Sequence, residues 1–367
     1  MSDEAAARCP GATVASCPTW DTKLASLTPT VGGSRTRRAA VPFSQSPASG
    51  MLAGALTSIA AGLCLLLVVL MLVFLLWYTW PAIRYNGLSI LNDITWNIGN
   101  QYGTGSSVHN GVSAEPGAEF GGLVFLVGTM LSALLAMVFA VPLALGVALT
   151  IVYRLPERLR LPINALIELM AGIPSVVYGL WGTIVLVPWV GNQVAPFVTH
   201  HFGFIPFLGG DAGSGNGLFA AAIVLAIMVM PIMVATVRDV LLAQPKSIYE
   251  ASMALGSTSW QAVTHAVLPS VRTGIVGAIL VAFGRALGET MAVLMVAGNA
   301  INILPHNIFS PINTIAAVVV SQLESAVSDA SGVAQRSLAE LALVLFVISL
   351  AVNTIARVAI RGQDRSH

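Results

Sequence analysis

Long apolar runs separated by short polar segments dominate the chain from about residue 50 onward. A helix needs roughly 20 mostly apolar residues to cross the hydrocarbon core of a membrane. Six segments reach about that length: 52–80, 121–152, 163–190, 218–237, 271–298 and 338–360. The pattern therefore predicts an all-α, polytopic transmembrane protein with about six spans.

The two ends of the chain differ from this middle part. Residues 1–50 are rich in Ser, Thr, Ala and Pro, with little apolar periodicity, and predict a disordered tail. The apolar run from Met51 to Trp80 is far longer than a signal-peptide core and contains no small-residue cleavage site, which indicates a retained span. We therefore expect a transmembrane domain over 51–362 and a short C-terminal tail over 363–367.

Three segments between the spans lack the length or the pattern of a span. The segment 81–120 is rich in Gly, Asn and Ser and predicts an irregular outer loop. The segment 191–217 has no Lys or Arg but several Phe and Gly, which is typical of a stretch at the membrane surface. About a dozen apolar residues within 311–327 are too few to span and predict an interfacial helix.

The positions of the cations determine the orientation. With the N-terminus in the cytoplasm, 14 of the 17 Lys and Arg residues fall on the inner side, Arg84 and Arg336 fall outside, and Arg285 remains within a span. Cytoplasmic loops of membrane proteins carry such an excess of Lys and Arg. Both termini are therefore predicted to be cytoplasmic.

Composition excludes several classes of function. Hydrophobic residues form 56% of the chain and charged residues 9%, too few charges to cover a soluble enzyme. A net charge of +1 argues against a nucleic-acid partner. The lysines, Lys23 and Lys246, lie in no phosphate-binding loop motif, so the chain is not expected to be an ATPase. The side chains of the adjacent His200 and His201 diverge, and no metal site, cofactor or catalytic residue is expected.

The cytoplasmic loop over about 239–270 contains a predicted short helix. Pro245 and Ser247 are typical of a helix start. Gly256 is typical of a helix end, where it permits a left-handed turn. An ordinary loop with an amphipathic helix has the same pattern, so the pattern alone leaves open whether a partner docks there.

This loop resembles the signature loop of ABC-importer permeases of the binding-protein-dependent type. The signature is E-A-A, three residues, G, nine residues and I-x-L-P, and the long spacing makes it specific. The resemblance implies a type I importer architecture and a coupling helix that seats in a separate ATPase subunit. Ser replaces the second Ala of the signature here, and Ala266 replaces Ile. The residues to which the resemblance assigns coupling are Glu250, Ala251, Ser252, Gly256, Leu268 and Pro269.

An arginine and a glutamate lie deep within the segment 271–298. Arg285 is about 14 residues, or roughly 21 Å of helix, from the start of the segment. A mid-membrane Arg costs about 2.5–3.5 kcal/mol on insertion scales. Glu289 follows at a spacing of four, which on a helix predicts a pair on one face. The pair either clasps helices together or lines a wet pathway in which Arg285 attracts an anion.

The segment 163–190 predicts a kinked span. Pro174 removes a backbone donor and Gly172 loosens the preceding turn. We assign these two residues to a kink with a possible role in gating. Glu168, near the cytoplasmic boundary, has two open interpretations: a carboxylate that reaches out to water, or a part of the gate.

Two membrane segments make the resemblance more specific. The runs A-G-I-P-S-V-V-Y-G-L-W-G and G-R-A-L-G-E-T-M-A-V resemble those of phosphate-transport permeases, and the likeness extends over about 50–360. It implies that Arg285 and Glu289 take part in phosphate passage. It also implies a bacterial inner-membrane location, a homologous second permease, two ATPase subunits that use ATP and magnesium, and an external phosphate-binding protein.

Three alternatives remain open. The first is an ABC permease for another oxyanion, such as sulfate or molybdate, since an arginine alone does not distinguish these anions. The second is an ion-coupled secondary transporter in which Arg285 and Glu289 relay protons. The third is a scaffold that senses phosphate without transporting it.

Overall fold

The computed structural model describes residues 47–100, 105–210 and 213–364, with side chains described from residue 54 to residue 358 within these ranges. The chain divides into two units, Met1–Cys64 and Leu65–His367, with the boundary inside helix α2 (Pro47–Asn86). In the first unit, the described part is the beginning of α2, where Leu56 and Leu63 are exposed. Residues 47–50 of the predicted tail belong to this helix, and residues 1–46 lie outside the described residues. All remaining features belong to the second unit.

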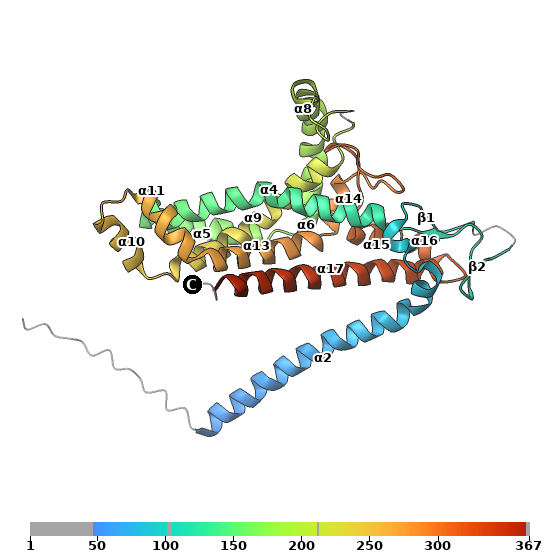
Figure 1. Cartoon of the computed structure of the whole chain (residues 1–367), viewed down its shortest axis with the longest axis horizontal. Coiled ribbons are helices and arrows are strands. Elements are labelled where there is room, and N and C mark those ends of the chain that lie inside the picture. Colours follow the sequence, from blue (N-terminus) through green and yellow to red (C-terminus); the bar gives the residue numbers. More distant parts are fainter. Residues whose placement is uncertain (1–46, 101–104, 211–212, 365–367) are drawn as a thin grey trace, which may run out of the picture. The chain divides into compact units, whose positions relative to one another are not determined.

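The second unit is mainly helical (Figure 1). Its strands are short: β1 (Trp96–Asn97), β2 (Ser107–His109), β3 (Val112–Ala114) and β4 (Glu119–Phe120). After the last part of α2, its described helices and π-helical segments are α3 (Ser89–Asn92), α4 (Leu123–Tyr153), α5 (Glu157–Ala171), α6 (Ser175–Trp181), η1 (Gly182–Leu186), α7 (Val187–Trp189), η2 (Val190–Val194), α8 (Ala195–Phe202), α9 (Leu218–Leu242), α10 (Lys246–Ala254), α11 (Ser259–Gln261), η3 (Ala262–Val267), α12 (Leu268–Ser270), α13 (Arg272–Leu287), α14 (Met291–Val296), α15 (Ile315–Ser321), α16 (Leu323–Val327) and α17 (Val333–Asp364).

The number of spans agrees with the prediction. Within the described residues, five continuous helical stretches are long and apolar enough to cross a membrane. A sixth span results if Ser259–Ser270 and Arg272–Leu287, which meet at a bend of 73°, count as one. The five continuous stretches are Gly54–Asn86, Leu123–Tyr153, Ser175–Phe202, Leu218–Leu242 and Val333–Val358.

Two predicted spans are interrupted. The segment 163–190 is not one span, because α5 ends at Ala171 and the spanning stretch starts only at Ser175. Pro174, which cannot donate a backbone hydrogen bond, occupies the position just before α6. The segment 271–298 is likewise divided, because α13 ends at Leu287 and α14 starts at Met291.

The core is built on the contact between α4 and α9, the most extensive helix pair in the described residues. One face of α4 carries a row of fully buried alanines, and α9 buries residues along most of its length. Small side chains at a spacing of three or four let two membrane helices approach closely. The alanines in this row are Ala133, Ala136, Ala140, Ala144 and Ala148.

The described residues of the outer segment 81–120 contain paired strands, so the predicted irregular loop was wrong. Antiparallel pairs β1–β4 and β2–β3 form there, and Trp96 packs against Phe120 with ring centroids 5.2 Å apart. Asn110 and Gly111 join β2 to β3, both with positive φ (49° and 78°). Asn-Gly is the preferred pair for such two-residue hairpins. The hairpin was therefore readable from the sequence but was missed.

The predicted interfacial helix within 311–327 consists of α15 and α16. α15 packs against α4, α14 and α17, and Ile315, Ala317 and Val318 are buried. The Ile315 backbone N–H donates to the Thr129 hydroxyl of α4 (2.9 Å). α15 is thus packed inside the protein, whereas Leu323 and Val327 of α16 are exposed. The segment 191–217 contains α8, which extends away from α4 and α9 (Figure 1), and its place at the membrane surface stays a prediction.

Candidate functional site

The predicted short helix in the cytoplasmic loop is α10, at one end of the helical bundle (Figure 1). It starts at Lys246 directly after Pro245, as expected. Gly256 follows its end with φ +88°, which confirms the predicted left-handed turn. No atom lies within 4 Å of the position that a Cβ of Gly256 would occupy, so backbone conformation, not space, favours glycine here.

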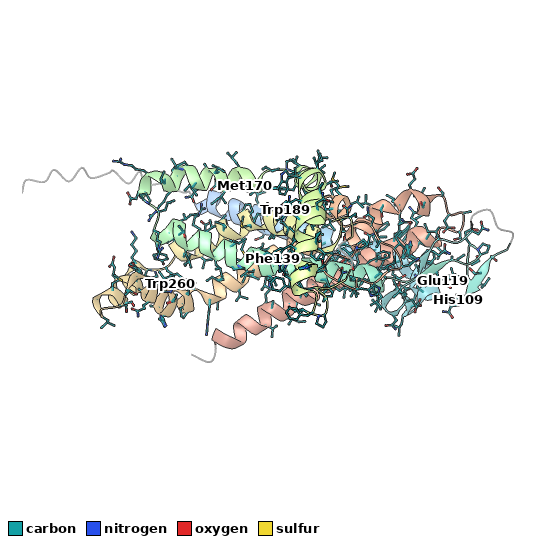
Figure 2. All side chains as sticks on the ribbon, turned by 90° about the horizontal axis from the view of Figure 1, so that it is seen from above. His109, Glu119, Phe139, Met170, Trp189 and Trp260 are labelled. Carbon is teal, nitrogen blue, oxygen red and sulfur yellow. The ribbon has the colours of Figure 1, made fainter. Side chains whose placement is uncertain are left out.

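Most side chains of α10 are exposed. It buries none of its residues, and Leu255, directly after it, is 89% exposed. Trp260 on α11 is exposed at the same end (Figure 2). Leu255 and Trp260 therefore both expose large apolar side chains next to α10.

Of the residues to which the resemblance assigns coupling, some lie on α10 and others on α12. Glu250 and Ala251 are exposed on α10. The Ser252 hydroxyl lies 3.1 Å from the Ser257 hydroxyl and donates to it, which ties the helix to the turn that follows. This contact gives the serine a role that alanine would not provide. Leu268 and Pro269 begin α12, just before the bend into α13.

The expected pairing of Arg285 with Glu289 on one helical face was wrong. Arg285 lies in the last turn of α13, and this helix ends at Leu287, so Glu289 belongs to the linker before α14. Within the described residues, no ion pair or hydrogen bond joins the two side chains. Arg285 is exposed and Glu289 is half-buried. The helix break therefore leaves an exposed guanidinium on a spanning segment.

The second membrane motif packs directly against the helix that follows this break. A Cβ on Gly179 would lie 2.9 Å from the Cα of Ala292, on α14. A Cβ on Gly182 would lie 2.8 Å from Val296, and the Thr183 hydroxyl donates to the Met295 carbonyl (3.0 Å). Glycine at positions 179 and 182 thus serves close packing, whereas a Cβ on Gly172 would meet only carbonyls of its own helix. The two motifs form one structural unit.

The predicted kink at Gly172 and Pro174 is a complete break between α5 and α6. The Tyr178 hydroxyl of α6 donates to the Met170 carbonyl of α5 (2.9 Å), which satisfies one of the backbone acceptors freed by the break. The helix is thus interrupted where the kink was predicted, while a role in gating stays a prediction.

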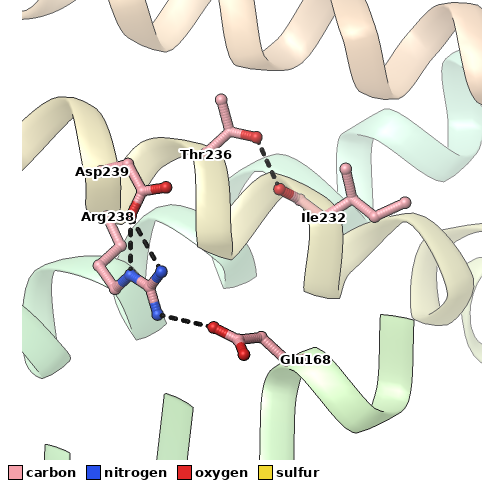
Figure 3. Close-up of polar contacts among 5 residues, drawn as sticks. All are labelled: Glu168, Ile232, Thr236, Arg238 and Asp239. Atoms are coloured by element: carbon pink, nitrogen blue, oxygen red, sulfur yellow. Dashed lines mark hydrogen bonds and ion pairs between the residues drawn. The ribbon is translucent and has the colours of Figure 1, made fainter. Parts of the chain in front are cut away.

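Glu168 contacts a residue that the sequence analysis did not single out. Arg238 on α9 lies 3.9 Å from the Glu168 carboxylate and 2.9 Å from that of Asp239 (Figure 3). The Arg238 side chain is 13% exposed and the Glu168 side chain 67%. The contact joins α5 to α9, across 70 residues of sequence, and no spacing pattern could have predicted it.

A second polar cluster that the sequence analysis missed lies near the outer end of α17. The Asn86 amide donates to the Glu340 carboxylate (2.7 Å) and to the Ser337 hydroxyl (3.0 Å). Glu340 is only 4% exposed. A glutamate within the apolar run 338–360 was the available signal, because buried carboxylates need a partner. The cluster joins the end of α2 to α17.

Comparison with known proteins identifies the family to which the chain belongs. The profile of the family described as "Binding-protein-dependent transport system inner membrane component" matches residues 140–366, a stretch that includes α10, the break after α13, and α17. The chain belongs to this family. It is thus a multi-pass transport subunit of the inner membrane, and the predicted importer-permease fold is confirmed.

Curated relatives of this permease carry more specific names. Over 288 residues it is 44% identical to "Phosphate transport system permease protein PstC 1" of Mycobacterium tuberculosis and of Mycobacterium bovis, which covers 78% of this chain and 85% of theirs. It is 39% identical over 270 residues to "Phosphate transport system permease protein PstC" of Pasteurella multocida, which covers 72% and 82%. The resemblance to phosphate-transport permeases is confirmed.

Proposed function

We propose that this chain carries inorganic phosphate across the inner membrane, as one of two permeases that together form the pathway of an ATP-driven importer. The relatives named as phosphate transport permeases, at 39–44% identity over most of the chain, support phosphate as the substrate. The observation that carries the proposal is Arg285, an exposed guanidinium on α13 directly before a helix break.

Electrostatics favours an anion at this position. An arginine within a membrane span is tolerated when it faces water or a partner charge. Among the described residues, Arg285 has no carboxylate within ion-pair distance. Guanidinium groups bind phosphate oxygens through two parallel hydrogen bonds. Glu289, in the linker that follows, limits how tightly an anion binds, because like charges repel.

The chain contributes no ATPase of its own in this proposal. Two ATPase subunits, with ATP and magnesium, would dock at α10 and transmit their closure to the membrane helices. α10 is suited to this role because it lies between two spanning stretches: it follows α9 after three residues and precedes the bent stretch that ends in α13. A homologous second permease and an external phosphate-binding protein would complete the importer.

The test is uptake of labelled phosphate at micromolar supply by cells that carry Arg285→Ala in place of the natural chain. We expect uptake to fall at least about tenfold, since one hydrogen bond to a charged group contributes about 1.5–3 kcal/mol. Arg357→Ala is the matched control, because Arg357 is also exposed but lies on α17. We expect the control variant to keep normal uptake.

Three further measurements separate the alternatives. Loss of complex assembly in Arg285→Ala would support the clasp in place of the pathway. Inhibition of wild-type uptake by excess sulfate would change the substrate to another oxyanion. Uptake that follows the proton gradient instead of ATP would indicate a secondary transporter.

A further inference from the structure

A pocket of about 340 Å³ lies behind α10, between this helix and the ends of α4 and α9. We call it the rear pocket. Its apolar wall includes Val152, Leu241 and Val267, and its polar wall comes from α4, α5, α10, α12 and the segment that joins α9 to α10. None of its lining residues belongs to α13 or α14, so it is separate from the site around Arg285.

Two cations line the rear pocket. The Arg160 guanidinium donates from Nε to the Leu155 carbonyl (3.1 Å) and from Nη2 to the Val152 carbonyl (2.9 Å). These bonds hold the guanidinium at the wall, while its Nη1 has no partner in the described part of the chain. Lys246, at the start of α10, is exposed, and its ammonium likewise has no partner among the described residues.

The rest of the polar lining suits a phosphate group. Glu250 adds one carboxylate, so the lining keeps an excess of one positive charge. Tyr153 at the end of α4 and Tyr249 on α10 pack with ring centroids 5.3 Å apart, and both line the pocket. Phenol hydroxyls and the Gln244 amide are neutral hydrogen-bond donors. An ion with several acceptor oxygens is a better match for these donors than a carboxylate or a cation.

The position of the pocket also favours a phosphate group as its ligand. It lies where α4 reaches the cytoplasmic boundary, in the region where the permease concentrates its Lys and Arg residues. Basic pockets between membrane helices on the cytoplasmic side bind phospholipid headgroups, and tyrosine is enriched at the same level.

We propose that the rear pocket binds a phosphate group on the cytoplasmic side and that the bound group braces α10 against α4. The group comes either from the headgroup of an anionic phospholipid or from free inorganic phosphate. A brace of this kind makes ATP hydrolysis sensitive to the membrane's anionic lipid or to internal phosphate. This effect rests on the proposed coupling role of α10, but not on phosphate passage at Arg285.

The test uses the complete transporter, with both permeases and both ATPase subunits, in lipid nanodiscs without the binding protein. ATP hydrolysis is measured as phosphatidylglycerol replaces phosphatidylcholine, and separately as inorganic phosphate is added to discs of phosphatidylcholine alone. The half-effect amount is the content of phosphatidylglycerol, or the concentration of phosphate, that gives half of the full change in ATP hydrolysis. We expect it to rise about fivefold in Lys246→Gln and in Arg160→Gln, the factor expected for the loss of one surface cation. Arg158→Gln is the matched control: Arg158 is an exposed cation on the same helix as Arg160 but does not line the pocket.

A response to phosphatidylglycerol alone identifies the lipid headgroup, and a response to phosphate alone identifies the free ion. The proposal is overturned if the wild type responds to neither, or if Lys246→Gln keeps the wild-type half-effect amount. The Lys246→Gln variant is the decisive test, because the Lys246 ammonium makes no contact with α4 whose loss could affect folding. The Arg160 guanidinium does make such contacts. If the proposed phosphate transport is wrong, phosphate uptake fails while the response of ATP hydrolysis still reports on the pocket.

Discussion

Replacing Gly179 by alanine inserts one methyl group into the contact between α6 and α14. The new Cβ would lie 2.9 Å from both the Cα of Ala292 and the sulfur of Met295. The methionine side chain can move aside, but the Cα belongs to the backbone of α14 and cannot move alone. The two helices must therefore separate by several tenths of an ångström, because ordinary carbon contacts begin at about 3.5 Å.

The expected size of the effect follows from this geometry. Overpacking of a tight contact costs about 1–3 kcal/mol. Since α14 directly follows the linker that contains Glu289, its displacement also shifts the break next to Arg285. We expect Gly179→Ala to lower the melting temperature of the purified transporter by several degrees and to reduce phosphate uptake more than the amount of assembled complex.

The assay compares this variant with Gly277→Ala. Gly277 lies within α13, and no atom lies within 4 Å of the position of its Cβ, so the same substitution should leave both quantities unchanged. Melting temperature is read from the loss of monodisperse complex after heating, and uptake from reconstituted vesicles. Wild-type values for both Gly179→Ala and the larger Gly179→Leu would refute the close packing of α6 on α14.

Three further predictions concern other contacts. Gly256→Val should weaken co-purification of the ATPase subunits, because φ +88° strains a non-glycine residue by about 1–2 kcal/mol. Gly256→Asn should retain most of the co-purification, and equal binding by both variants would contradict this reasoning. Asn86→Ala leaves the buried Glu340 without its amide donor and should lower the free energy of unfolding by about 1–3 kcal/mol, seen as a lower melting temperature. A melting temperature restored in the double variant with Glu340→Leu would support the assignment. Glu168→Gln should change stability by less than about 1 kcal/mol, because its contact with Arg238 is long and Glu168 is mostly exposed; a large loss on heating would show that the pair is a structural clamp.

Local patterns in the sequence were sufficient for the features that depend on a few neighbouring residues. Apolar length indicated about six spans, and the described part of the chain has five continuous stretches long and apolar enough to span and one bent pair. Pro245 and Gly256 indicated the start and end of α10. Such features are readable because membrane thickness, the missing N–H of proline and the backbone freedom of glycine act locally.

Contacts between distant segments were not readable in this way. The spacing of Arg285 and Glu289 predicted a pair on one continuous helix, but α13 ends between them. Nothing in the local pattern distinguishes Gly288 as a helix end from Gly284 within the helix. The position of α14 against Gly179 and Gly182, more than 100 residues earlier, accompanies this break and belongs to the tertiary packing.

By itself, the sequence determined the class of protein, the approximate number of its spans, and the start and end of α10, because composition and local stereochemistry control these features. Only the tertiary structure decided which charges meet. In the structure, Arg285 does not pair with Glu289, whereas Glu168 forms an ion pair with Arg238. The buried Glu340 carboxylate accepts a hydrogen bond from the Asn86 amide. The physical reason is that ion pairs and hydrogen bonds need their atoms within about 3–4 Å, and at such distances the path of the whole backbone, not the spacing along the chain, sets the partners.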